Sequence, residues 1–314
     1  MSPRFSIIIP HKNSVDLLER CLKSIPVRDD IEVIVVDDNS TFTPNERQKI
    51  ESFNDNQTLV LFTKEGRGAG YARNVGLDHA SGEWVLFADA DDYFYTKNLE
   101  IMLSSNIPSE YQVIVYGAKY VFLDGSHKWY GWYDPEKPNS MSIERMDYPQ
   151  FLYRRLVTPW IKMVRKDLLV DNNIRFEEVM FSNDELFCTK VALAIHYYGK
   201  VNMPIYHHVR LSTGLVESTT NKRRFMIRWN VYLRKEIYLK KHGTQVPDYN
   251  LLSATFFYNK YNLLLYCAVK EAILLGKKKA WRDYTSFCRQ TQISRIPYLY
   301  MLRNQSIQTP DIPQ

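Results

Sequence analysis

Short apolar runs alternate with segments of helical pattern through the first third of the chain. The runs at 5–9, 31–38, 58–63 and 83–88 are rich in β-branched and aromatic residues and are predicted to be strands. Between them, residues 14–25 carry apolar positions at helical spacing, and 44–53 and 68–79 are also predicted to be helices. Near-continuous apolar strands that alternate with helices indicate a parallel sheet covered on both faces, so the fold class is α/β.

The pattern changes after residue 105. A strand that begins near Val113 leads into a hairpin that turns at Asp124-Gly125. Residues 135–150 are expected to form a loop, 182–199 a helix from about Asp184, and 204–211 a late strand. Beyond about 220 the pattern is helical. We therefore predict an α/β domain over 1–218, a helical C-terminal region over 219–303 and a loose tail over 304–314.

Composition and charge narrow the picture only slightly. Hydrophobic residues make up 45% and charged residues 24% of the 314, which is ordinary for a globular protein. The formal charge of +6 fits anionic small molecules or an acidic membrane face, while the scattered basic residues form no known nucleic-acid-binding module. The four cysteines include no CxxC pair, and no signal peptide or membrane span is predicted, so a cytoplasmic protein is expected.

Three carboxylates follow the fourth predicted strand. Asp89, Asp91 and Asp92 end an apolar run, where they repel each other unless a cation is present. Mg²⁺ and Mn²⁺ favour oxygen ligands from one or two carboxylates together with phosphate. The alternative is that one aspartate caps the next turn or helix, but capping engages one carboxylate and hardly three.

Two further stretches carry groups suited to a nucleotide. Asp37 and Asp38 end the second strand, where a carboxylate can accept hydrogen bonds from a ribose hydroxyl or a base N–H; an ordinary Asx-turn is the alternative. Glycines at 66, 68 and 70 precede and open a helix whose N–H groups face an anion, with Arg67 and Arg73 nearby. Diphosphate contact and a flexible loop both remain open.

These stretches should meet in space. In open α/β sheets, ligands bind outside the carboxyl ends of the strands. The segment from Pro10 to Asn13, the pair at 37–38 and the cluster at 89–92 each follow a strand at that edge. We therefore expect one crevice lined by all three.

Four motifs in series carry a resemblance. "SIIIPHKN", "VIVVDDNS", "GYARNVGL" and "FADADD", in this order and spacing, closely resemble the family 2 glycosyltransferases with the GT-A fold, over residues 5 to about 215. The resemblance implies a mixed, mainly parallel GT-A-type sheet flanked by helices, here with a C-terminal helical extension. It also implies an inverting enzyme that uses a nucleotide-sugar and a divalent metal, Mn²⁺ or Mg²⁺.

The resemblance also implies roles for individual residues. Asp91 and Asp92 would bind the metal. The donor-binding set would comprise Pro10, Asn13, Asp38, Arg67, Arg73 and Asp89. In "FSNDELF", Asp184 matches the aspartate that the family keeps as the base, while Asn183 stands where Glu is frequent. The alternative for Asp184 is favourable first-turn charge at a helix N-terminus.

The acceptor side is less defined. Trp132, Trp160, Lys162, Asn183 and His208 are the candidate acceptor residues. Aromatic faces suit sugar rings, but aromatic hairpins are more often packed strands, and His208 could equally be an ordinary strand histidine. Residues 223–241 place apolar side chains on one arc and basic ones on the other, which fits a docked amphipathic helix or peripheral contact with the inner face of a membrane.

The function expected from this resemblance is sugar transfer from a nucleoside-diphosphate sugar, with UDP favoured. The acceptor would be a hydroxyl of a glycan or lipid-linked acceptor in cell-surface polysaccharide synthesis. One alternative is a sugar-nucleotide pyrophosphorylase, although "PHKNS" lacks the glycine-rich signature expected after its first strand. Another is a catalytically silent subunit that binds a nucleotide or glycan.

Overall fold

The computed structural model describes residues 2–122, 124–146 and 157–210, with scattered positions between 227 and 243. The chain divides into two compact units, Met1–Thr219 and Thr220–Gln314. All elements discussed below belong to the first unit.

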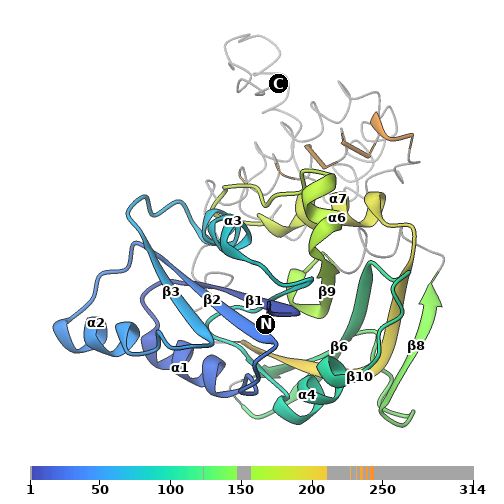
Figure 1. Ribbon diagram of the computed structural model, residues 1–314, viewed down its shortest axis with the longest axis horizontal. Coiled ribbons are helices and arrows are strands. Elements are labelled where there is room, and N and C mark those ends of the chain that lie inside the picture. Colours follow the sequence, from blue (N-terminus) through green and yellow to red (C-terminus); the bar gives the residue numbers. More distant parts are fainter. Residues whose placement is uncertain are drawn as a thin grey trace, which may run out of the picture. The chain divides into compact units, whose positions relative to one another are not determined.

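The first unit is built on one mixed sheet whose central strand order is β3-β2-β1-β4-β9-β6-β10-β5 (Figure 1). Strands β1, β2, β3 and β4 pair in parallel, as do β6 and β10, whereas β9 and β5 run antiparallel to their neighbours. Two further strands pair at the side of this path, β7 with β6 and β8 with β10. The strands are β1 (Phe5–His11), β2 (Ile31–Asp38), β3 (Thr58–Thr63), β4 (Trp84–Phe87), β5 (Tyr93–Phe94), β6 (Val113–Phe122), β7 (His127–Gly131), β8 (Ser140–Met146), β9 (Lys162–Arg165) and β10 (Tyr198–Arg210).

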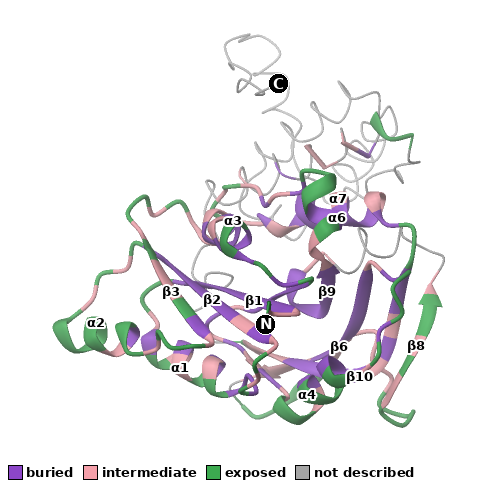
Figure 2. Ribbon diagram, in the orientation of Figure 1, coloured by how far each residue is buried: buried purple, intermediate pink, exposed green. Residues whose placement is uncertain are grey.

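Helices cover the sheet on both sides. Helices α1, α2 and α4 lie on one side, and α3, α6 and α7 lie on the other (Figure 1). Their bounds are α1 (Val15–Lys23), α2 (Pro44–Glu51), α3 (Ala69–His79), α4 (Thr96–Ser104), α6 (Lys166–Asp171) and α7 (Asp184–Ala194), with a short 3₁₀ turn at Pro159–Ile161. Every residue of β1 and β4 is buried, as expected for central strands covered on two faces (Figure 2).

A glycine sets the distance between α3 and β1. A Cβ placed on Gly76 would lie 2.4 Å from Cγ2 of Ile8, well inside van der Waals contact. Gly76→Ala is therefore expected to lower the free energy of unfolding by about 1–3 kcal/mol, because the core must shift to admit the methyl group. Urea denaturation followed by circular dichroism measures this, and an unchanged midpoint would show that Ile8 moves aside at little cost.

The predicted α/β fold, a mixed sheet flanked by helices, is confirmed, and its four leading strands and three helices lie where the pattern indicates. The loop predicted over 135–150 is wrong in part, because Ser140–Met146 forms the edge strand β8. Within the described part of the chain, β10 is the one strand that pairs with β8, and none of the residues of β8 is buried, so it lacks the apolar run of a covered strand. The helix predicted over 182–199 ends at Ala194, and β10 begins at Tyr198.

Little of the second unit is described. The predicted amphipathic segment 223–241 lies mostly outside the described residues, and the predicted tail 304–314 lies wholly outside them. Among the described residues, no helix combines the length and the hydropathy needed to cross a bilayer.

Candidate functional site

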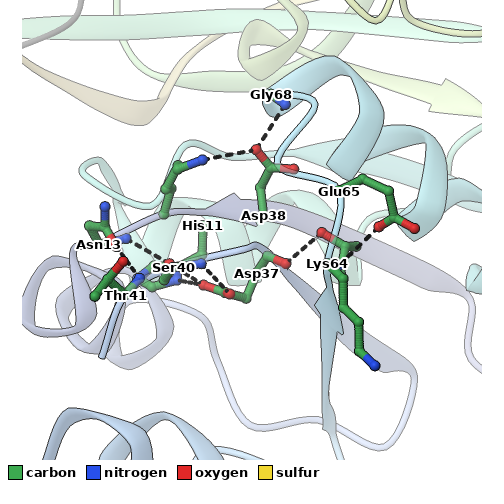
Figure 3. Close-up of polar contacts among 11 residues, drawn as sticks. His11, Asn13, Asp37, Asp38, Ser40, Thr41, Lys64, Glu65 and Gly68 are labelled. Carbon is green, nitrogen blue, oxygen red and sulfur yellow. Dashed lines mark hydrogen bonds and ion pairs between the residues drawn. The ribbon is translucent and has the colours of Figure 1, made fainter. Parts of the chain in front are cut away.

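The loops after β1 and β2 are joined by a buried histidine–aspartate pair (Figure 3). Nδ1 of His11 lies 2.8 Å from Oδ2 of Asp37, and the backbone N–H of Ser40 donates to Oδ1 of Asp37 at 2.9 Å. Burial alone would raise the pKa of Asp37, but the hydrogen bonds from His11 and Ser40 outweigh it and lower that pKa. Both oxygens of Asp37 are thus used by the protein, so Asp37 holds the loops in place.

Asp38, the next residue, presents one free oxygen (Figure 3). Its Oδ2 accepts the backbone N–H of Gly68 at 2.8 Å and lies 3.6 Å from Nζ of Lys12. Its Oδ1 is buried and has no hydrogen-bond partner within the described part of the chain. Because an unsatisfied buried carboxylate oxygen is costly, this atom is suited to receive a donor from a bound ligand.

The other predicted residues of this edge have structural contacts. Asn13 adopts a left-handed backbone with φ of 53°, and its Oδ1 accepts the N–H of Thr41 at 2.9 Å, which ties the first loop to the second. Pro10 is buried in β1, in register with Val36 of β2. Arg67 pairs with Glu178 at the surface. These contacts are all with other parts of the protein, and none of them assigns the three residues a ligand.

Asp92 is buried completely, with 0% of its surface exposed. Its Oδ2 lies 2.9 Å from the hydroxyl of Tyr206, which donates to it, and 2.9 Å from Nδ1 of His208. Its Oδ1 accepts the backbone N–H of Val209 at 2.7 Å. With both oxygens occupied from β10, Asp92 anchors the acidic loop to that strand. Its predicted role as a metal ligand has no support in these contacts.

Asp91 differs from Asp92 in its surroundings. Its carboxylate has no hydrogen-bond partner among the side chains of the described residues. Burial, and then the negative charges of Asp92 and Asp89, raise the pKa of Asp91 to about 7. A divalent cation would relieve this crowding of negative charge, so the donor set fits a metal held partly by the phosphates of a ligand. No group of three or more His, Cys, Asp or Glu side chains in the described ranges could hold an ion unaided.

Arg73 connects the acidic loop to the start of α7. One terminal nitrogen donates to Oδ1 of Asp89 at 2.5 Å, and the other donates to Oδ1 of Asn183 at 2.8 Å. The guanidinium carbon of Arg73 also lies 5.2 Å from the ring centre of Phe176. Arg73 thus brings residues 89 and 183 together despite their separation in sequence.

Asp184 is the first residue of α7 and follows Asn183 directly. Burial, and then the negative charge of Glu185, raise the pKa of Asp184 to about 6, while Arg73 acts in the opposite direction. A carboxylate with this pKa is deprotonated near neutral pH and is still basic enough to accept a proton from a hydroxyl.

Of the candidate acceptor residues, two belong to an aromatic cluster beside Asp92. The ring of Trp160 stacks on His208, with ring centres 5.0 Å apart, and on Tyr206 at 5.2 Å. Lys162 is buried, and its Nζ donates to the carbonyl of Thr158 at 2.5 Å and lies 3.5 Å from Sγ of Cys188. Burial lowers the pKa of Lys162. The ammonium group of Lys162 therefore contacts the protein interior, at Thr158 and Cys188.

Trp132 is placed apart from this cluster. Its ring lies over Nζ of Lys200, 4.7 Å away, near the beginning of β10. Lys200 is in register with Val115 of β6 and His208 with Tyr120, five residues further along β6, which corresponds to about 16–17 Å. The contact with Lys200 therefore does not place Trp132 beside His208.

Several residues that shape the site were not predicted. Tyr206 and Asn74 hold loops of the site through their side chains, and Phe176 packs under Arg73. No sequence signal marks Phe176. The alternation of Tyr206 and His208 along a predicted strand does place the two on one face and could have indicated Tyr206.

Comparisons with known proteins identify relatives. Residues 6–169 match the family described as "Glycosyl transferase family 2". The chain is 26% identical over 259 residues to the GalNAc(5)-diNAcBac-PP-undecaprenol beta-1,3-glucosyltransferase of Campylobacter jejuni, covering 81% of each protein. It is 31% identical over 222 residues to the poly(ribitol-phosphate) beta-N-acetylglucosaminyltransferase TarS of Staphylococcus aureus, covering 67% of this chain but 36% of TarS.

Solved structures agree on the fold. Residues 1–349 of S. aureus TarS in complex with UDP-GlcNAc superpose with a TM-score of 0.59 at 24% identity, covering 74% of this chain and 66% of that one. The mannosyltransferase PcManGT of Pyrobaculum calidifontis, in complex with GDP-Man and Mn²⁺, gives a TM-score of 0.51 at 19% identity, covering 96% and 83%. The family match spans more than half of the chain, and the chain therefore belongs to glycosyl transferase family 2.

Proposed function

We propose that this glycosyltransferase moves a sugar from a UDP-sugar to a hydroxyl of a glycan or lipid-linked acceptor, with inversion at the anomeric carbon. One observation carries the proposal: Arg73 hydrogen-bonds both to Asp89 of the acidic loop and to Asn183, the residue before the candidate base. This contact supports a single site that combines the donor side and the base side of the reaction.

The donor would be held at two points. The free Oδ1 of Asp38 is suited to accept a hydrogen bond from the base or the ribose. Asp91, with the phosphates of the donor, would hold a divalent metal, and such an ion stabilises charge on a departing diphosphate. The N–H of Gly68 donates to Asp38, so this glycine would help to hold the carboxylate proposed to face the base or the ribose.

The chemical step needs a base for the acceptor hydroxyl. Asp184 is proposed for this role because it is partly exposed, deprotonated near neutral pH, and placed at a helix start fixed by Arg73. Removing the proton as the hydroxyl attacks, on the side opposite to the leaving diphosphate, gives inversion. Holding both partners in line removes much of the entropic barrier.

The class of acceptor is proposed from relatives. The C. jejuni enzyme is named for an undecaprenol-linked substrate, and TarS for poly(ribitol-phosphate). A cell-surface glycan built on a lipid carrier fits both. For such an acceptor we place the enzyme at the cytoplasmic face of the membrane, as a peripheral protein.

A thermal-shift panel tests the donor. Melting temperatures are measured with UDP, GDP, UDP-GlcNAc, UDP-glucose and GDP-mannose, each with Mn²⁺ or with EDTA. We expect UDP compounds to raise the melting temperature in the presence of Mn²⁺ and to lose most of this effect in EDTA, since ligand at about 100 times its Kd stabilises by about 2.7 kcal/mol. A shift with GDP compounds alone would overturn the UDP assignment, and no shift at all would count against nucleotide-sugar chemistry.

A further inference from the structure

Helix α3 holds the segment that leads to the candidate base. The side-chain amide of Asn74 donates to the carbonyl of Phe176 at 3.0 Å and accepts the N–H of Phe176 at 2.9 Å. At Gly70, an added Cβ would lie 2.1 Å from the carbonyl oxygen of Glu177 and 3.0 Å from Cβ of Asn183. The backbone of α3 therefore touches both ends of the segment 176–183.

Arg73 adds a charged connection between the same two elements. Only 6% of Arg73 and 8% of Asn183 are exposed, so their 2.8 Å hydrogen bond is shielded from water. The same guanidinium binds Asp89 at 2.5 Å. A single buried cation thus touches the acidic loop and the residue that precedes Asp184.

Asn183 does not cap α7 although it occupies the N-cap position. Its side chain makes no hydrogen bond to the first turn, and its oxygen is directed to Arg73. Ser182, just before it, has a φ of 57°, which is unfavourable for a serine. The start of α7 is therefore oriented by Arg73, since the usual capping bond is missing.

We propose that Arg73 and Asn183 are a positioning pair, which fixes Asp184 relative to the donor site and, because the amide is neutral, adds no second negative charge to the guanidinium that already pairs with Asp89. The inference rests on the proposed function, because it concerns the residue that would take the acceptor proton. A carboxylate at position 183 would compete with Asp89 for Arg73 and place a further negative charge beside Asp184.

The titratable and charged groups that act on Asp184 come from several elements. The negative charges of Glu185 and Asp89 raise its pKa, and the positive charge of Arg73 lowers it. Further groups that interact with it electrostatically are Lys162 of β9, Cys188 of α7, Tyr120 of β6 and Tyr130 of β7. Of the groups that act on the pKa of Asp184, Arg73 is the cation that position 183 contacts directly.

Two substitutions separate charge from position. Asn183→Asp keeps an oxygen for Arg73 and adds a negative charge, whereas Asn183→Ala removes the acceptor. For the first, the melting temperatures of Asn183→Asp and Asn183→Asp/Asp184→Asn are compared between pH 4 and pH 8, alongside wild type and Asp184→Asn. A carboxyl whose pKa is raised by folding stabilises the protein while protonated, and this stability is lost as the pH rises through the folded pKa.

The difference between each pair should therefore decline as the pH rises from the ordinary carboxyl pKa of 3.8 and level off near pH 6 in the wild-type background. In the Asn183→Asp background we expect the difference to level off about one pH unit higher, as is typical for an added like charge nearby. An unchanged end point would overturn the charge part of the proposal. This result does not depend on turnover.

The positional part is tested by kinetics with Asn183→Ala. We expect the turnover number, measured as UDP released from UDP-GlcNAc or UDP-glucose with Mn²⁺, to fall about 10–100-fold, while the Kd for UDP stays within about twofold. In Arg73→Lys the single ammonium group cannot bond to both Asp89 and Asn183, so we expect the same loss of turnover as in Asn183→Ala. Asn172→Ala, which removes one hydrogen bond to the carbonyl of Leu168 at the surface, is the matched control and should leave turnover unchanged.

The outcomes are distinguishable. Unchanged turnover in Asn183→Ala, or an equal loss of UDP binding and turnover, would contradict the positioning role. If the wild type neither binds UDP nor releases it, the proposed function fails. The double-mutant coupling between Arg73→Lys and Asn183→Ala in thermal unfolding then still reports on the pair, and a coupling near zero would overturn it.

Discussion

Replacing Asp184 by Asn is expected to lower the turnover number about 10²–10⁴-fold, while the Kd for UDP stays within about twofold. The asparagine keeps the size of the side chain but cannot take the proton of the acceptor hydroxyl. Asp184 also lies at the start of α7, where it does not carry the donor contacts proposed for Asp38 and Asp91. Turnover is measured as UDP release in the presence of acceptor, and binding is measured by calorimetry.

Asp171→Asn is the matched control, because Asp171 is an exposed residue at the end of α6. It should behave as wild type in both measurements. An Asp184→Asn variant that retained turnover within a few-fold would show that another group takes the proton. Binding of UDP by a wild type that turns over no donor would favour the silent nucleotide-binding subunit.

Replacing Asp92 by Ala is expected to lower the free energy of unfolding by about 3–5 kcal/mol. The change removes a buried acceptor and leaves the hydroxyl of Tyr206, Nδ1 of His208 and the N–H of Val209 without their partner. Burial alone would lower the pKa of His208, but the hydrogen bond to Asp92 and the charge of that carboxylate raise it, so the ring would also lose the partner of its charged form. Urea denaturation measures the loss.

Asp91→Ala provides the comparison, since Asp91 is the less buried neighbour. We expect it to cost less than about 1 kcal/mol of stability, because removing a crowded carboxylate relieves repulsion, and to abolish the Mn²⁺-dependent part of UDP binding. The two variants therefore separate a structural aspartate from a ligand. Equal stability loss in both, or metal-dependent binding that survives Asp91→Ala, would contradict these roles.

The central strands could be predicted because burial on both faces demands continuous apolar runs, and β1, β2 and β4 have them. Strand β9 could not be predicted, because its four residues, Lys162–Arg165, show no apolar run of strand length. They form a strand because they pair with β4 and β6 on either side. Edge strand β8 was not predicted for a related reason, since none of its residues is buried. The local pattern of apolar residues indicates which positions are buried, but it does not indicate a pairing partner that lies far along the chain.

The candidate site shows the same division. The positions of Asp38, Asp91 and Asp184 followed from strand ends, a helix start and the family resemblance. The different surroundings of Asp92 and Asp91 could not be predicted. The groups that hydrogen-bond to the Asp92 carboxylate come from β10, and His208 among them lies 116 positions away in the sequence. The role of Asn183 was hidden similarly, since Arg73 reaches it across 110 positions.

The central claim is that Asp38, Asp91 and Asp184 surround one metal-bound nucleotide-sugar. A crystal structure of the protein with UDP and Mn²⁺ tests it most directly. We predict the ion within about 2.2 Å of a carboxylate oxygen of Asp91, the uridine in hydrogen-bond contact with Oδ1 of Asp38, and Asp184 facing the open side of the diphosphate. A nucleotide bound elsewhere, or an ion that is not coordinated by Asp91, would contradict the account.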